Sequence, residues 1–165
     1  MKISVRDAFA SDTYHKEYDL KLTLEELSDF PNGAACDEVL SHVVISSESG
    51  VVTCEISVSA EFETVCSRCV KCFKMPLSFK SKKLVRRDAE EDFEDVIYSD
   101  SGLCIDIVEE IRMQIYFEFP AKPLCSEDCK GLCPVCGCDL NTESCSCDIR
   151  TIDPRLAVLK NLFDK

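Results

Sequence analysis

The sequence predicts an α+β fold, in which an antiparallel, β-rich domain carries one packed helix and is followed by a cysteine-rich tail and a short C-terminal helix. Long segments alternate apolar and polar residues, a later segment repeats apolar residues at helical spacing, and the region after Pro123 is rich in cysteine. A chain of 165 residues accommodates one such domain with a small appended module, but not two large domains. We therefore divide the chain into a β-rich domain at 1–122 and a tail at 123–165.

The N-terminal region is predicted to hold short extended segments at 3–5 and 18–22. One helical turn is expected at 24–27, because Thr23 and Glu26 have the spacing of a capping box. Pro31 and Gly33 lie just beyond this turn and are expected to end it.

The clearest strand signals lie in the middle of the chain. Segments 39–47 and 51–65 flank the turn signal Glu48-Ser49-Gly50, and the second segment places on one face Val52, Cys54, Ile56, Val58, Ala60 and Phe62. After Cys66-Ser67-Arg68-Cys69 the alternation resumes, with Phe73, Met75, Leu77 and Phe79 inward and Lys74, Ser78, Lys80 and Lys82 outward. Two hairpins that share the long middle strand predict a meander or a partly closed sheet.

The remaining elements follow an acidic stretch at 88–95, which we interpret as a solvated loop. A helix is expected to begin after Asp106, with Glu109 at the third helical position, and to end before Pro120. Its apolar stripe comprises Ile107, Val108, Ile111 and Ile115. Asp153-Pro154-Arg155 has the form of an N-cap followed by proline and predicts the short C-terminal helix.

Composition and charge exclude several classes of protein. The chain has 31 acidic against 19 basic residues and a net charge of −12, which argues against a general nucleic-acid or anionic-membrane binder. No apolar run is long enough for a membrane span or a secretory signal. The 13 cysteines are odd in number, so a reducing cytoplasm is expected, where clustered thiols usually hold a metal or perform redox chemistry.

The cysteine spacing predicts a four-thiolate metal site in the tail. Cys133-Pro134-Val135-Cys136-Gly137 has the form of a zinc knuckle, because a two-residue spacer lets both sulfurs reach one tetrahedral ion. Cys145 and Cys147, just across a short turn, complete this first site.

A second site is predicted from the pairs Cys66/Cys69 and Cys125/Cys129, which would join the hairpin tip to the start of the tail. One or two structural zinc ions are thus expected, with an iron–sulfur cluster, a redox dithiol, a disulfide or an unmetallated turn as alternatives. The cysteines left over are Cys36, Cys54, Cys72, Cys104 and Cys138.

Signals of catalysis are weak. His15 and His42 lie far apart in sequence, and the chain has no phosphate-binding glycine loop and no HExxH motif. A metal-dependent hydrolase keeps an open coordination position, whereas the pairings here join thiol with thiol. We therefore expect no enzyme and no small-molecule substrate, and the oligomeric state stays open.

A basic segment from residue 68 to 87 is the one candidate for contact with RNA phosphate. Its basic residues are Arg68, Lys71, Lys74, Lys80, Lys82, Arg86 and Arg87, together with Lys83. We name all but Lys83 as RNA-contact candidates. The alternative is a solvated strand face that the neighbouring acids balance.

Several of these motifs together resemble a known family. They are Cys66-Ser67-Arg68-Cys69, the segment from Pro123 to Gly137, Asp139-Leu140-Asn141, Cys145-Ser146-Cys147 and the segment from Asp153 to Lys160. Over essentially its whole length the chain is similar to the bacterial YceD family, the large ribosomal RNA subunit accumulation proteins. The resemblance implies a cytoplasmic, non-catalytic factor in ribosomal RNA processing or 50S subunit biogenesis, with pre-ribosomal RNA or a large-subunit ribosomal protein as partner.

Two other functions stay open. The net charge of −12 would also suit an acidic adaptor that binds a basic ribosomal protein without touching RNA. The third hypothesis is a thiol redox enzyme or a metal-dependent enzyme. It is disfavoured because the sequence offers no ligand set that leaves an open coordination position.

Overall fold

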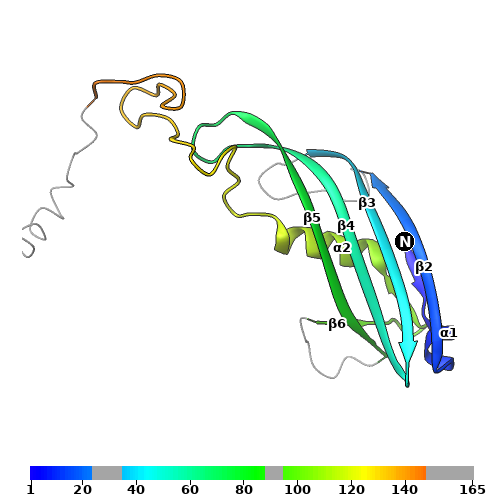
Figure 1. Cartoon of the computed structure of the whole chain (residues 1–165). Helices are drawn as coiled ribbons and strands as arrows, with labels where there is room; N and C mark the ends of the chain where they lie inside the picture. Colours follow the sequence, from blue (N-terminus) through cyan, green and yellow to red (C-terminus); the bar gives the residue numbers. More distant parts are fainter. Residues whose placement is uncertain (24–34, 88–94, 148–165) are drawn as a thin grey trace, which may run out of the picture.

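The protein, described here from a computed structural model, is an elongated molecule built on one long, bent sheet (Figure 1). The structure describes residues 1–23, 35–87 and 95–147. Its elements in chain order are β1 (Lys2–Ser4), α1 (Arg6–Ala10), β2 (Thr13–Thr23), β3 (Ala35–Glu48), β4 (Val51–Val65), β5 (Cys72–Arg86), β6 (Val96–Tyr98), β7 (Cys104–Asp106) and α2 (Ile107–Glu118).

The main sheet has the strand order β2-β3-β4-β5-β6. Strands β2 to β5 form an antiparallel meander. The two hairpins that share β4 confirm the prediction for β3, β4 and β5, and the pairing of β2 with β3 is added to it. Strand β2 is longer than the extended segment predicted at 18–22, since its register with β3 runs from Thr13↔Glu48 to Thr23↔Glu38. Strand pairing extends β2 over residues whose own apolar pattern is too weak to predict it.

Two short pairings depart from the antiparallel prediction or add to it. Strand β6 pairs with β5 in parallel, and β1 and β7 form a separate two-stranded antiparallel sheet. Strand β1 overlaps the extended segment that the sequence predicts at 3–5. Strands β6 and β7 are additions, and each spans only three residues. That is too short for sequence periodicity to reveal, and the partners lie far apart in the chain.

The hydrophobic core lies between the sheet and α2, which Figure 1 shows along one face of the sheet. Asp106 caps the helix by accepting a hydrogen bond from the Glu109 backbone N–H, as the sequence predicts. The apolar stripe of α2 is completely buried at Ile107, Ile111 and Ile115. Beyond the end of the helix, the ring of Phe119 meets that of Phe62 edge to face, with centroids 5.5 Å apart.

A polar contact also joins the two layers. Lys83, on the inward face of β5, pairs with Glu110 of α2 at 2.7 Å, and both side chains are only 16% exposed. Glu110 in addition accepts a hydrogen bond from the Gln114 amide at 2.7 Å. This ion pair helps to fix α2 against β5, because breaking it would leave a partly buried charge without its partner.

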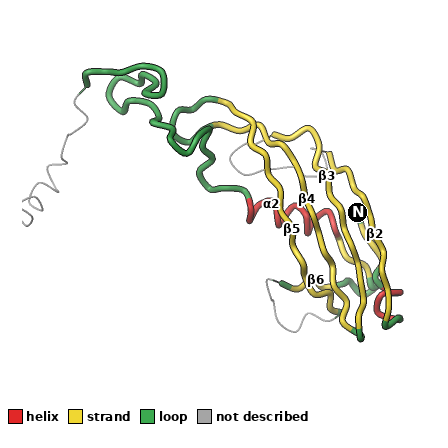
Figure 2. The backbone as a smooth tube through the Cα atoms, in the orientation of Figure 1, coloured by secondary structure: helices red, strands yellow, loops and turns green. Residues whose placement is uncertain are grey.

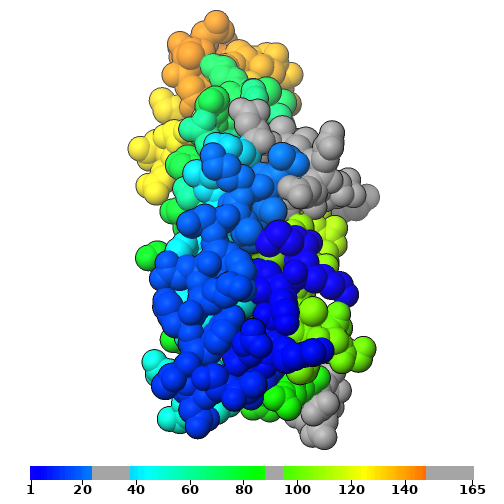
Figure 3. Space-filling view, turned by 90° about the vertical axis from the view of Figure 1, so that its right-hand side faces the viewer, coloured from blue at the N-terminus to red at the C-terminus, as the bar shows by residue number. Residues whose placement is uncertain are grey.

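The tail leaves the sheet at the end far from α1 and is drawn as loop in Figure 2. Figure 3 shows the same arrangement from the side, with the tail at one end of the elongated molecule and α1 towards the other. Within the described residues the tail contains one isolated β-bridge, between Leu132 and Asp139. The predicted helical turn at 24–27, most of the acidic stretch at 88–95 and the predicted C-terminal helix lie outside the described residues.

None of the helices in the described part of the chain combines the length and hydropathy that crossing a bilayer requires. The longest of them, α2, has 12 residues.

Replacing Ile111 by Ala is expected to lower the free energy of unfolding by about 2–5 kcal/mol, because it opens a cavity under the sheet. Met113→Ala is the matched control, since Met113 lies on the same helix but is 44% exposed. Its effect should stay within about 0.5 kcal/mol. Urea unfolding followed by circular dichroism measures both, and equal losses would contradict the assignment of this face of α2 to the core.

Candidate metal centres

The tip of the β4–β5 hairpin forms a tight knuckle. The backbone N–H of Cys66 donates to the Lys71 carbonyl at 2.9 Å, and the N–H of Val70 donates to the Cys66 carbonyl at 2.9 Å. Val70 has φ +59°, a left-handed conformation that costs a β-branched residue free energy. The turn brings Cys66 and Cys69 to the same side, where both are buried.

The tail repeats this knuckle with the same hydrogen bonds. The N–H of Cys133 donates to the Cys138 carbonyl at 2.8 Å, and the N–H of Gly137 donates to the Cys133 carbonyl at 2.9 Å. Gly137 has φ +75° and takes the place that Val70 occupies in the first knuckle. The two Cys-x-x-Cys segments therefore have one backbone design, which tolerates a side chain after the second cysteine.

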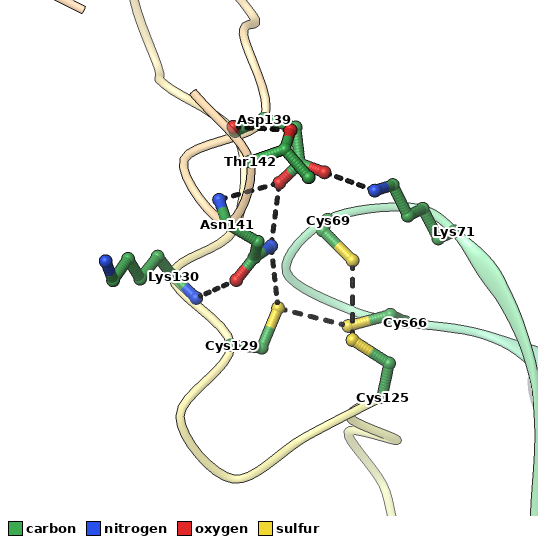
Figure 4. Close-up of polar contacts among 9 residues, drawn as sticks. All are labelled: Cys66, Cys69, Lys71, Cys125, Cys129, Lys130, Asp139, Asn141 and Thr142. Carbon is green, nitrogen blue, oxygen red and sulfur yellow. Dashed lines mark hydrogen bonds and ion pairs between the residues drawn. The ribbon is translucent and has the colours of Figure 1, made fainter. Parts of the chain in front are cut away.

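The first set of four thiols joins this hairpin tip to the tail (Figure 4). Cys66, Cys69, Cys125 and Cys129 place their sulfur atoms within 4.8 Å of one another. The Cys66 and Cys129 sulfurs are 3.8 Å apart, and those of Cys69 and Cys125 are 3.6 Å apart.

These separations match one tetrahedral ion. A zinc–sulfur distance of about 2.3 Å implies sulfur–sulfur edges of about 3.8 Å around a tetrahedron. A disulfide would instead bring two sulfurs to about 2.05 Å. The set predicted as the second site thus has the geometry of a closed site for one cation.

The second set lies wholly within the tail. Cys133, Cys136, Cys145 and Cys147 also place their sulfurs within 4.8 Å of one another. Cys133 is buried, whereas the other three thiols are partly or fully exposed. Both groups of four contain the cysteines that sequence spacing predicts, and among the described residues no histidine or carboxylate belongs to either set.

Backbone dipoles prepare the leading cysteine of each knuckle to bind a cation. Burial acts to raise the pKa of the Cys66 thiol, but N–H groups of neighbouring residues, Cys125 foremost, outweigh it and lower the pKa to about 6. Hydrogen bonds from the backbone of Cys136 and Val135 lower the pKa of Cys133 to about 6 as well. The Val135 N–H lies 3.4 Å from the Cys133 sulfur. Thiolates of this kind are the form that binds metal.

One later cysteine of each set, Cys125 in the first and Cys147 in the second, has its pKa shifted in the opposite direction. The pKa of Cys125 is raised to about 12, first through its hydrogen bond with the Cys69 thiol, and that of Cys147 is raised to about 12 through its hydrogen bond with Cys136. Four thiols this close resist carrying four negative charges together. A divalent cation would remove that repulsion, so each set is electrostatically suited to one.

The tail is also fastened to the knuckle through backbone groups. The Ser67 N–H donates to the Pro123 carbonyl at 2.9 Å, and the Leu132 N–H donates to the Arg68 carbonyl at 3.0 Å. The Arg68 guanidinium donates in turn to the Cys129 carbonyl at 2.8 Å. Gly131 permits this approach, since a Cβ there would lie 2.9 Å from the Arg68 carbonyl oxygen.

The predicted RNA-contact residues do not form one patch. Arg68 and Lys71 belong to the knuckle, where Lys71 pairs with Asp139 of the tail. Lys74 and Lys82 project from the outer sheet face and pair with Glu61 at 2.8 Å and Glu55 at 2.6 Å.

The other three candidates are Lys80 and Arg86 on β5 and Arg87 just beyond it. Arg87 stacks on the Phe9 ring at 4.5 Å. Arg86 is exposed at the end of β5. Lys80 lines an open trough of ≈ 670 Å³ on the outer face, together with Lys21, Ser57 and Ser78.

Of the unassigned cysteines, Cys54 is completely buried in the core, as predicted. Burial raises the pKa of its thiol to about 12, so it remains neutral. Cys138 lies beside the second set without belonging to it. The side chain of Cys36 is not among those that the structure describes.

Comparison with known proteins identifies a family for this chain. The model of the family described as "Large ribosomal RNA subunit accumulation protein YceD" matches residues 54–163. The chain belongs to the YceD family. The part that matches the YceD model begins within β4 and contains both thiol sets and α2.

Three relatives give the range of similarity. Proteins named "Large ribosomal RNA subunit accumulation protein YCED homolog 1, chloroplastic" are 43% identical over 60 residues in Zea mays and 34% identical over 61 residues in Arabidopsis thaliana. These matches cover 36% and 37% of this chain but only 20% and 19% of the plant proteins. "Uncharacterized protein YlbN" of Bacillus subtilis is 30% identical over 121 residues, or 70% of this chain and 69% of that protein. No solved structure matches the chain.

Chelation is expected to loosen the tail of this YceD protein while the sheet survives. Among the described residues of the tail, the buried cluster consists of thiols with few apolar side chains, so we expect coordination to supply most of the free energy that orders this part of the chain. Limited proteolysis with and without chelator, followed by mass spectrometry, should show new cleavage confined to residues 120–147. A tail that is free of metal and equally resistant would contradict the prediction.

Gly131→Ala is expected to raise the alkylation rates of Cys66 and Cys129 about tenfold. Residue 131 has a left-handed backbone conformation, and the new Cβ would also clash with the Arg68 carbonyl oxygen, so the substitution should destabilise the docked tail by about 1–3 kcal/mol. Gly137→Ala is the matched control, because Gly137 has φ +75° but nothing within 4 Å of a Cβ. Quantitative mass spectrometry of the alkylated cysteines measures both. Equal effects would show that backbone conformation alone, and not the close approach, requires glycine at 131.

Proposed function

We propose that this chain is a non-catalytic, cytoplasmic factor in ribosomal RNA accumulation and large-subunit biogenesis, with a tail organised by two structural zinc ions. The observation that carries the proposal is the pair of closed four-thiol sets in a member of the YceD family. The names of the two plant relatives support a role in large-subunit RNA accumulation.

Zinc is the ion that the donor set favours. Four thiolates around a single tetrahedral position are typical of structural zinc sites. An iron–sulfur cluster of four irons would bind each thiolate to a different iron and hold the sulfurs further apart than the 3.6–3.8 Å found in the first set. Elemental analysis of protein purified without chelator tests this assignment, with two equivalents of zinc as the expected result.

A non-catalytic role is supported by the coordination of both sets. A catalytic zinc keeps one position for water or substrate, whereas each set here offers four protein thiols to its ion. A structural site of this kind would make the fold of the tail rigid, and the tail would present this fixed surface to a ribosomal partner.

The partner we favour is pre-ribosomal RNA, contacted locally through the outer face of the sheet. Lys80 and Arg86 are exposed there, and Lys80 lines the open trough beside Lys21. An acidic adaptor that binds a basic ribosomal protein is the second candidate. The adaptor is favoured by the net charge of −12. It is also favoured because Lys71, Lys74 and Lys82 already pair with acidic residues of the same chain.

The double variant Lys80→Glu/Arg86→Glu is expected to weaken association with large-subunit precursor particles and with isolated precursor RNA. Losing about two phosphate contacts should lower the slope of log affinity against log salt by about 1.4 for single-stranded RNA. Lys82→Glu is the matched control, because Lys82 is exposed on the same strand but pairs with Glu55. Its effect should be smaller.

Ribonuclease treatment before sedimentation separates the two candidates. Release of the protein from the particles supports RNA contact. Retention after ribonuclease, with loss of binding when Asp88, Glu90, Glu91 and Asp92 are neutralised, would favour the adaptor and overturn the RNA assignment.

A further inference from the structure

One side chain connects the two thiol sets. Asn141 belongs to the loop between Cys136 and Cys145, two members of the second set, yet its amide reaches the first set. The Asn141 Nδ2 group donates to the Cys129 sulfur at 3.5 Å and to Asp139 Oδ1 at 2.7 Å (Figure 4). Its Oδ1 atom accepts the Lys130 N–H at 2.8 Å, which fixes the orientation of the amide.

Asp139 anchors the same loop to the hairpin. Its carboxylate pairs with Lys71 of the first knuckle and accepts the backbone N–H of Asn141 at 2.9 Å. The Leu140 N–H donates to the Gly131 carbonyl at 3.0 Å. The loop of the second set is therefore docked on the first set by an ion pair, a backbone hydrogen bond and a hydrogen bond to a sulfur.

These contacts depend on both sites being ordered. Residues 139–144 belong to neither of the hydrophobic clusters described, so the loop depends on these polar contacts and on the cysteines on either side of it. A cation bound by the second set would fix those cysteines and thereby place Asn141 against Cys129. By linkage, a cation bound by the first set would fix Cys129 and favour the docked loop to the same extent.

We propose that the two metal sites load cooperatively and that Asn141 is the positioning residue through which the second site supports the first. The proposal rests on the two structural ions of the proposed function. Hydrogen bonds to metal ligands typically change metal affinity by about 10–100-fold, which sets the size of the expected coupling.

A double-mutant cycle on the full chain tests the coupling, with Zn²⁺ at buffered free concentrations as the probe. The readout is zinc-dependent protection of Cys66 against alkylation, which reports the first site alone. Disabling the second site with Cys145→Ser/Cys147→Ser is expected to weaken zinc binding at the first site about tenfold or more. Asn141→Ala should cause a similar loss, and the triple variant should lose little beyond either. Thr142→Ala is the matched control, because Thr142 lies in the same loop and donates to the Asp139 carbonyl but not to a sulfur.

A spectroscopic readout separates positioning from a general loss of structure. In cobalt-substituted protein, Asn141→Ala should shift the thiolate-to-cobalt charge-transfer band to lower energy, since the Cys129 sulfur loses a hydrogen bond. Thr142→Ala should leave the band in place. An unchanged band together with undiminished protection of Cys66 in Cys145→Ser/Cys147→Ser would overturn the coupling.

The outcomes also distinguish this inference from the proposed function. If the wild-type chain binds no zinc, the structural zinc ions of the proposed function are absent and that proposal is wrong. If it binds two equivalents and each site titrates as though the other were absent, only the coupling is wrong.

Discussion

The structure depends most on the convergence of four thiols at the tip of one hairpin. Cys66 and Cys129 are 63 positions apart in the chain, yet their sulfurs lie 3.8 Å from each other. Bringing such distant residues together costs conformational entropy, and thiol groups packed this closely repel once they ionise. A cation bound by all four would offset both costs and would hold the tail on the sheet.

The sheet provides the rigid support that this junction needs. Strands β4 and β5 have 15 residues each and pair along almost their whole length, so the knuckle lies at the end of a stiff two-stranded ribbon. The core between the sheet and α2 includes β4 residues from Val52 to Phe62 and stabilises the ribbon over that length. Cys66, Cys69 and Cys129 form a separate small cluster at its tip. The described residues thus form two separate buried clusters, one apolar and one made mainly of thiols that could hold a metal ion.

The distribution of charge takes on a different meaning in the folded chain. As a sequence, residues 68–87 look like one basic stripe. In the structure, Arg68 and Lys71 fasten the tail, Lys83 pairs with Glu110 beneath the sheet, and Lys74 and Lys82 pair with acids on the adjacent strand. Any contact with phosphate would therefore rest on fewer cations than the segment contains, which agrees with a local contact by an acidic protein.

The sequence by itself determined the features that depend on local spacing. Alternation specified β3, β4 and β5 and the buried face of β4. Asp106 and Glu109 marked the start of α2, and cysteine spacing grouped the thiols that the structure brings together. Only the tertiary structure decided the parallel pairing of β6, the ion pair of Lys83, the close approach at Gly131 and the position of Asn141 against Cys129. Each of these is a contact between segments that are distant in the chain or face each other across a loop. Their partners carry no periodic signal, because what selects them is where the folded backbone places them.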